Sequence, residues 1–244
     1  MKMGCIICDP KCKYKDCICG EKFCSFDCIL KNFADINLLS KSKFTLIKPW
    51  SISTITVVCN FNSKIDVKKY TDIYGKDCLK KQFYNCLHYY IGVKYQSKTK
   101  ISVKIFSNGK IQMAGVLNVT AISYAIRKIF KRLSKIHALE KDAFISGVKV
   151  CMINSDFKIN KTIRQKNLCK LFEEKNLSYI KRYSFNPNKY PAINIKIKGI
   201  PECTCLIFRS GSIIITGGND VNEYLEIYKK IIKLFEENYE DVLF

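Results

Sequence analysis

The sequence predicts an α+β protein made of two tandem repeats, each an antiparallel sheet covered by helices, with a small cysteine-rich module in front of them. Two observations predict the repeats. The segment IFSNGKIQMAG at 105–115 recurs as IFRSGSIIITG at 207–217, 102 residues later, and each copy precedes a helix with one apolar face. The third observation is that seven of the fourteen cysteines fall within the first 28 residues. We expect the module at 1–40 and the repeats at 41–140 and 141–244.

The cysteine-rich module is expected to bind zinc. The segment MKMGC lacks the apolar stretch of a signal peptide, and reduced thiolates at this density are typical of Zn²⁺ sites rather than disulfides. Cys5 and Cys8 form a Cys-x2-Cys pair, while Cys24 and Cys28 share one face of a helix start. We predict that these four hold one zinc ion. Alternates, or ligands of a second site, are Cys12, Cys17 and Cys19.

The stretch from Lys13 to Cys28 also resembles small treble-clef zinc modules of the MYND, HIT and MYM kind. It differs from them because no His or Cys pair follows Cys28, and because the Cys17-x-Cys19 spacing is one residue short. A redox-active or merely cysteine-rich tail is the alternative interpretation.

Each repeat is predicted to contain a strand, a helix, several antiparallel strands and a long helix. In both copies an alternating strand leads into an Asn-Gly or Ser-Gly turn and a second strand that ends in glycine. Asp220 followed by Glu223 predicts the start of the second long helix. The apolar face of the long helices comprises Ile122, Ala125, Ile126, Ile129 and Leu133 in the first repeat, and Tyr224, Ile227, Tyr228, Ile231 and Phe235 in the second.

The remaining cysteines and the two histidines give no sign of catalysis. His137 is expected after a helix and His88 before a strand, and neither belongs to a Ser/His/Asp or Cys/His arrangement. The sequence also lacks a Gly-rich phosphate loop, so it argues against an enzyme. We expect the scattered cysteines to be small core residues: Cys59, Cys78, Cys86, Cys151, Cys169, Cys203 and Cys205.

Positive charge is concentrated in the first repeat. The net charge is +21, and residues 41–140 carry 19 basic and 4 acidic side chains, a surplus of 15. Residues 141–244 carry 17 and 12, and residues 1–40 carry 6 and 5. Such a surplus favours a nucleic-acid partner. The alternative is a compositional bias, because only five of the 42 basic residues are arginine and Lys, Ile and Asn abound.

The duplicated segment resembles the TATA-box-binding protein family. The resemblance covers about 190 residues and depends on SKIDVK (63–68), on KYPA (189–192) and on the two turn segments followed by a helix. It implies a saddle, that is, a curved antiparallel sheet with helices on its convex face. The implied function is transcription initiation by binding the minor groove of AT-rich double-stranded promoter DNA, with aromatic wedges that bend it.

The resemblance also implies the DNA-binding residues. Phe106 and Phe208 match one wedge of each repeat, Tyr190 matches the second wedge of repeat two, and Tyr89 or its neighbour Tyr90 that of repeat one. Lys110 matches a lysine near the DNA backbone. The groove-face positions are Lys104, Gln112 and Ala114 in the first repeat, and Leu206, Ile214 and Thr216 in the second.

The chain departs from the family at several positions. Lys104 and Gln112 stand where the family has apolar residues, and they could reach base edges or phosphate, so the preferred element need not be a standard TATA sequence. Thr54 and Val148 stand where the family has its base-contacting asparagines, so that role is not carried over. The segment 185–190 reads FNPNKY, where the family has acidic and apolar contacts to the B-type initiation factor.

Two functions from different classes follow from this comparison. The first is a DNA-bending initiation factor that recruits an initiation-factor-B-like protein or RNA polymerase subunits, in part through the zinc module. The second is a protein-interaction scaffold that kept the fold but lost DNA bending. No membrane span is expected, so we expect an intracellular protein. The resemblance extends to versions from large DNA viruses, which implies a location in the nucleus, or in the viral factory or virion of such a virus.

Overall fold

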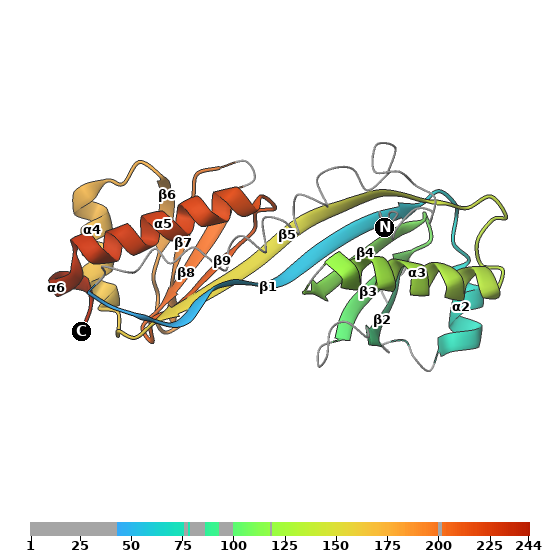
Figure 1. Cartoon of the computed structure of the whole chain (residues 1–244), viewed down its shortest axis with the longest axis horizontal. Coiled ribbons are helices and arrows are strands. Elements are labelled where there is room, and N and C mark those ends of the chain that lie inside the picture. Colours follow the sequence, from blue (N-terminus) through green and yellow to red (C-terminus); the bar gives the residue numbers. More distant parts are fainter. Residues whose placement is uncertain (1–42, 76–77, 79–85, 93–99, 118, 200–201) are drawn as a thin grey trace, which may run out of the picture. The chain divides into compact units, whose positions relative to one another are not determined.

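The computed structural model describes residues 43–75, 78, 86–92, 100–117, 119–199 and 202–244 (Figure 1). They form two compact units. The described residues of unit 1 lie within 54–151, and those of unit 2 lie in two segments, 43–53 and 152–244. Two long strands, β1 (Leu46–Phe61) and β5 (Ile145–Ile159), contribute to both units. The predicted division at residue 140 follows sequence similarity, whereas the spatial division falls inside these strands.

Unit 1 is an antiparallel sheet with a long helix across it (Figure 1). Its strand order is β2-β3-β4-β1, continued by β5. The short helix α2 begins after Asp66, whose carboxylate accepts a hydrogen bond from the Lys69 backbone N–H at 2.9 Å and so caps the helix. The bounds of the other elements are β2 (Cys86–Gly92), β3 (Lys100–Phe106), β4 (Lys110–Val116), α2 (Val67–Tyr74) and α3 (Val119–Lys135).

Unit 2 repeats this arrangement and adds one more described strand. Its order is β1-β5-β9-β8-β7-β6, and α5 crosses β7, β8 and β9 (Figure 1). Asp220 caps α5 by accepting a hydrogen bond from the Asn222 N–H at 2.8 Å, as the sequence predicts. The elements are β6 (Ile180–Ser184), β7 (Ala192–Ile197), β8 (Cys203–Phe208), β9 (Ser212–Thr216), α4 (Gln165–Lys175), α5 (Val221–Glu237) and α6 (Tyr239–Val242).

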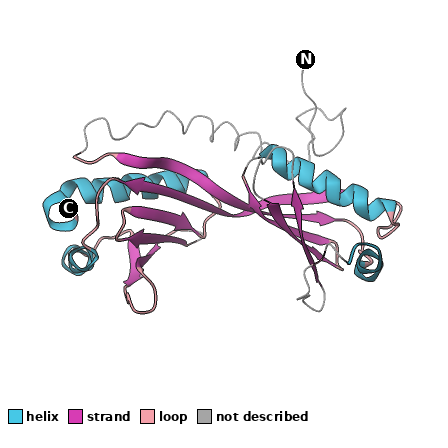
Figure 2. Cartoon of the chain, turned by 90° about the horizontal axis from the view of Figure 1, so that it is seen from below, coloured by secondary structure: helices cyan, strands magenta, loops and turns pink. Residues whose placement is uncertain are grey.

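The core of each unit lies between its helices and one face of its strands (Figure 2). All ten apolar positions predicted for the two long helices are buried. They pack with alternate strand residues, such as Val103 and Ile105 in unit 1 and Ile207 and Ile213 in unit 2, which are 0% exposed. Burying each aliphatic side chain of this size contributes about 1.5–3 kcal/mol, so these two interfaces hold the fold.

The expectations for the scattered cysteines and for the histidines hold only in part. Cys59, Cys86, Cys203 and Cys205 are buried, and Cys78 and Cys169 are half-buried. Cys151, the last residue of unit 1 along β5, is exposed, so its prediction as a core residue was wrong. His137 follows α3 as expected. His88 lies within β2 rather than before a strand.

Candidate nucleic-acid interface

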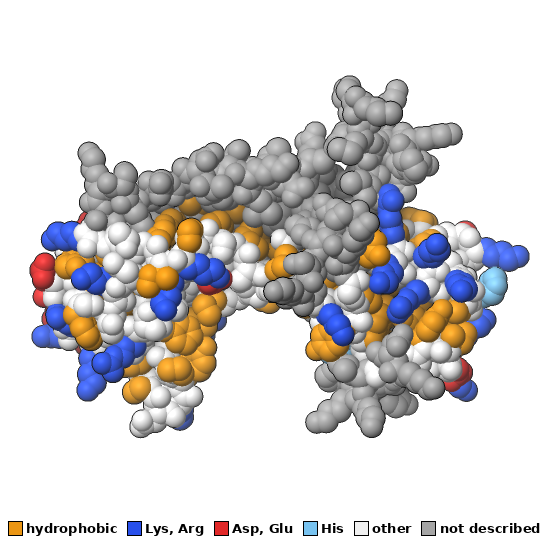
Figure 3. Space-filling model, turned by 60° about the horizontal axis from the view of Figure 1, so that its bottom comes forward, with side chains coloured by type: hydrophobic (Ala, Val, Ile, Leu, Met, Phe, Trp, Pro, Cys, Tyr) orange, Lys and Arg blue, Asp and Glu red, His pale blue; other side chains and the backbone are white. Residues whose placement is uncertain are grey.

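In each unit one face of the sheet is covered by helices and the other is open. Along β9, Ile213 and Ile215 are fully buried, whereas Ile214 and Thr216, which alternate with them, are partly exposed. The same alternation places Gln112 and Ala114 of β4 on the open face of unit 1. In Figure 3, hydrophobic side chains gather in a patch of unit 2 at the left, and Lys and Arg side chains are spread over the visible surface of both units.

Unit 2 carries an aromatic pair at one end of its open face. Tyr190 is 46% exposed, and its ring lies 6.0 Å from that of Phe208, centroid to centroid, at an interplanar angle of 63°. The Gln165 side chain at the start of α4 supports this pair. Its Nε2 donates to the Pro191 carbonyl at 2.9 Å and to the Ile207 carbonyl at 3.0 Å. One amide therefore joins the residue after Tyr190 to the residue before Phe208.

The loop that carries Tyr190 is shaped by an asparagine. The Asn186 carbonyl accepts hydrogen bonds from the N–H groups of Lys189 at 3.0 Å and Tyr190 at 2.9 Å. The Asn186 side chain accepts a further bond from the Asn188 N–H at 3.2 Å. Asparagine favours such turns because its side chain bonds the backbone two residues on.

In unit 1, Phe106 is partly exposed and lies opposite Cys86 in the β2–β3 register, as Phe208 lies opposite Ala192. Tyr89, predicted as the second wedge, is fully buried: its ring stacks on Tyr70 at 5.5 Å, and burial, with Tyr70 contributing, raises the pKa of its hydroxyl. That prediction is corrected, because adjacent strand residues point to opposite faces. Tyr90, the alternative, is 50% exposed.

The strand register also indicates a residue that the sequence comparison missed. Tyr190 precedes Ala192 by two residues, and the residue two before Cys86 is Tyr84. Tyr84 lies outside the described residues. The sequence itself already points to Tyr84. The segments YNCLHYYI at 84–91 and YPAINIKI at 190–197 both begin with tyrosine and continue with a similar alternation of apolar residues.

The centre of the open face differs between the units. In unit 1, Lys104 of β3 lies opposite Gln112 of β4. The equivalent pair in unit 2 is Leu206 opposite Ile214. Thr216 donates a hydrogen bond to Asn154 in unit 2, and Lys110 is exposed at the start of β4 in unit 1. The structure thus brings all the predicted groove residues except Tyr89 onto the open faces or their ends.

His88 is an open-face residue whose position the sequence did not predict. It lies opposite Lys104, and its Nε2 is 2.8 Å from the Ser102 hydroxyl. Burial, with Lys104 contributing, lowers the pKa of the imidazole, so the ring is neutral at neutral pH.

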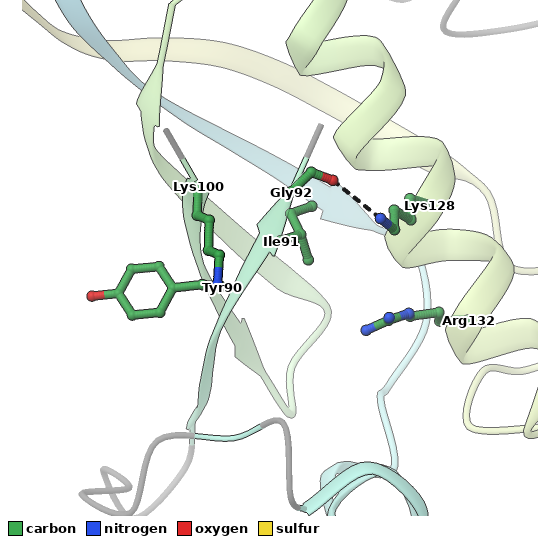
Figure 4. Close-up of a pocket in the computed structure, with 6 residues that line it drawn as sticks. All are labelled: Tyr90, Ile91, Gly92, Lys100, Lys128 and Arg132. Atoms are coloured by element: carbon green, nitrogen blue, oxygen red, sulfur yellow. Dashed lines mark hydrogen bonds between the residues drawn. The ribbon is translucent and has the colours of Figure 1, made fainter. Parts of the chain in front are cut away.

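A basic pocket lies at the β2 edge of unit 1 (Figure 4). Lys128 and Arg132 reach it from α3 and Lys100 from β3, while Tyr90 points away from the helix. The Lys128 ammonium donates to the Gly92 carbonyl at 3.1 Å, which blocks part of the strand edge. The three cations make this edge suited to a phosphate group.

The structure was also searched for metal-binding groups and for membrane-spanning helices. The predicted zinc ligands all lie outside the described residues, and within the described part no group of three or more His, Cys, Asp or Glu side chains could hold a metal ion. Among the helices of the described residues, none is long and apolar enough to cross a membrane.

Comparison with known proteins agrees with this geometry. The family model described as "Transcription factor TFIID (or TATA-binding protein, TBP)" matches residues 50–136 and 150–238. The chain is similar to a "TATA-box-binding protein-like" protein of Acanthamoeba polyphaga mimivirus, with 28% identity over an alignment of 163 residues that covers 58% of this chain and 44% of that protein. The "TATA-box-binding protein" of Thermococcus sibiricus is 23% identical over 133 residues, which are 54% of this chain and 66% of that one.

The fold is similar to that of a solved structure, "Methanococcus jannaschii TBP". The TM-score is 0.57 at 19% identity, and the match covers 77% of this chain and 98% of the solved one. The matched region spans less than half of the mimivirus relative and about two thirds of the Thermococcus sibiricus one.

Proposed function

Because the chain belongs to the TATA-binding protein family, we propose that it is a transcription initiation factor that binds AT-rich promoter DNA in the minor groove and bends it. The observation that carries this proposal is the aromatic pair Tyr190 and Phe208, partly exposed at the end of an open sheet face. Insertion of such side chains between base steps is the mechanism known for TATA-binding proteins themselves. Phe106 provides a ring at the equivalent place in unit 1.

The surface chemistry supports the same function. Leu206 and Ile214 form an apolar centre in unit 2, which suits a groove floor from which water is displaced. Lys100 of β3 and Lys110 of β4, which are exposed strand residues of unit 1, supply cations for phosphate oxygens. Each open face then engages half of the promoter element.

The test compares an AT-rich with a GC-rich duplex of equal length at several salt concentrations. We expect a lower Kd for the AT-rich duplex, and a shorter distance between dyes at its two ends when the protein is bound. Equal and salt-sensitive binding to both duplexes, without a change in that distance, would reject minor-groove bending.

The second candidate function is a scaffold for a transcription complex that keeps the fold without TATA-specific bending. Lys104 and Gln112 favour it, because polar side chains at the centre of the open face are costly to desolvate. The same bending measurement separates the two functions, since a scaffold would leave the duplex straight.

The protein partners are proposed from the loop at 185–190. Its turn is built by Asn186 and holds Lys189 but no acidic side chain. We propose that an initiation-factor-B-like protein or polymerase subunit adapted to this neutral-to-basic loop binds here. Pull-down of purified candidates with wild-type protein and with Asn186→Asp tests it; equal recovery with both would argue against this loop. The proposed location is the nucleus, or the viral factory or virion of a large DNA virus.

The cysteine-rich segment is proposed to hold zinc. We expect metal analysis of the purified chain to find at least one Zn²⁺, lost on Cys5→Ser with Cys28→Ser, because a tetrahedral site needs all four thiolates. As a matched control, Cys151→Ser removes an exposed thiol outside the module and should leave the zinc content unchanged. A wild-type chain that is fully folded without metal would reject the site.

A further inference from the structure

The two open faces differ most at their centres. Lys104 and Gln112 in unit 1 occupy the positions of Leu206 and Ile214 in unit 2, 102 residues apart in both cases. The geometry at these positions is the same. Lys104 lies two residues before Phe106 and Leu206 two before Phe208, and all four central side chains are partly exposed. The two units therefore have equivalent backbone positions here and differ in the polarity of the side chains.

The polar pair belongs to a longer row in unit 1. His88 lies opposite Lys104, and Val58 of β1 lies opposite Gln112, so three of the four side chains in this row carry polar groups. In unit 2 the row is Asn194, Leu206, Ile214 and Asp156, with the polar members only at its ends. Asp156 forms an ion pair with Lys48, which neutralises that end.

In the minor groove, the polar centre of unit 1 and the apolar centre of unit 2 would favour different base pairs. An A·T pair presents only acceptors there, whereas a G·C pair adds the guanine N2 amino group, a hydrogen-bond donor. An apolar side chain pressed on that amino group leaves the donor without a partner. The Gln112 carbonyl can accept its hydrogen bond, while the Gln112 amide and the Lys104 ammonium can donate to guanine N3 or cytosine O2.

Resting on the proposed function, we propose that the two units follow different sequence rules: unit 1 binds a half-site that accommodates a G·C pair, and unit 2 a half-site restricted to A·T pairs. Lys104 and Gln112 are the specificity-determining residues of unit 1. Because only one half-site tolerates the amino group, the protein binds an asymmetric element in one orientation.

The experiment scans 2,6-diaminopurine for adenine along an AT-rich duplex. This base adds the guanine-like amino group to the minor groove and leaves the major-groove pattern of adenine in place. For the wild-type chain we expect Kd to rise about tenfold at positions in one half of the element, and less than about threefold in the other half.

Variants assign the halves to the units. In Lys104→Leu with Gln112→Ile, the tolerant half should become intolerant, with Kd rising about tenfold at its modified positions. The reciprocal Leu206→Lys with Ile214→Gln should make the other half tolerant. Lys131→Leu removes the same charge from the exposed side of α3 and should weaken binding without changing the profile.

Each outcome bears on a different claim. Equal intolerance of both halves in the wild-type chain, or the same profile for the Lys104/Gln112 variant as for Lys131→Leu, would overturn the inference while leaving promoter binding in place. A wild-type chain that binds no duplex would instead reject the proposed function, and the half-site rule with it. All variants meet identical duplexes, so changes in DNA stiffness caused by the modified base are common to them.

Discussion

Replacing Phe106 and Phe208 together by alanine is expected to lower the affinity for an AT-rich duplex by about 100-fold or more. Both rings lie at the end of an open face and are partly exposed, so their loss removes DNA contacts rather than core packing. Stacking of a base on an aromatic side chain contributes about 1–3 kcal/mol, and two such contacts are lost. Gel shift and dye-to-dye distance measure the affinity and the bend.

A matched control removes two other exposed aromatic side chains, one from each unit. Phe144 is 49% exposed just before β5, and Phe244 is 52% exposed at the carboxyl end. Neither belongs to the strand pairs that form the open faces. Phe144→Ala with Phe244→Ala should leave binding within about twofold of the wild type. If the two double variants bound DNA equally well, the aromatic rings on the open faces would not be wedges.

Most of the repeat fold could be predicted from the sequence because its signals are local. The alternation of apolar residues, the Gly turns and the 3.6-residue periodicity of the long helices each act within about 20 residues. The buried faces of α3 and α5 therefore confirm the sequence analysis residue by residue.

The second wedge of repeat one could not be placed in this way because the repeats differ in length. Phe106 pairs with Cys86, 20 positions earlier, whereas Phe208 pairs with Ala192, 16 positions earlier. A constant offset of 102 residues carries Tyr190 to His88 and suggests the neighbouring Tyr89. The strand pairing of repeat one spans four more residues than that of repeat two, so counting back from Cys86 as from Ala192 leads to Tyr84, in agreement with the match of YNCLHYYI to YPAINIKI.

The centre of the open face illustrates a second limit of the sequence. Lys104 and Gln112 are both visible as departures from an apolar pattern, but their joint effect depends on cross-strand pairing, which places them side by side with His88. In the sequence, His88 and Gln112 are 24 residues apart, so nothing in it shows that they belong to the same row. The pairing of β2, β3 and β4 brings these separate polar residues together in one row.

The turn glycines should produce the largest effects on stability. Gly109 and Gly211 have φ of 90° and 80°, and a Cβ at Gly109 would lie 2.3 Å from the Phe61 carbonyl oxygen and 2.5 Å from that of Ser63. At Gly211 it would lie 2.4 Å from the Lys161 carbonyl oxygen. Left-handed φ alone costs an alanine about 1 kcal/mol, and the backbone clash adds to it. We expect Gly109→Ala and Gly211→Ala each to lower the free energy of unfolding by about 3 kcal/mol or more.

The same glycines hold the wedge phenylalanines in place. The Gly109 N–H donates to the Phe106 carbonyl at 3.1 Å, and the Gly109 carbonyl accepts from the Phe61 N–H at 2.9 Å. Gly211 makes the corresponding bonds to Phe208 at 3.1 Å and Ile159 at 3.0 Å. Urea titration measures the stability, and Gly75→Ala is the control, because its Cβ would meet nothing closer than 3.6 Å. Equal urea midpoints for Gly109→Ala and Gly75→Ala would mean that the turn does not need glycine, and that the repeated Gly is no constraint on where the aromatic ring stands.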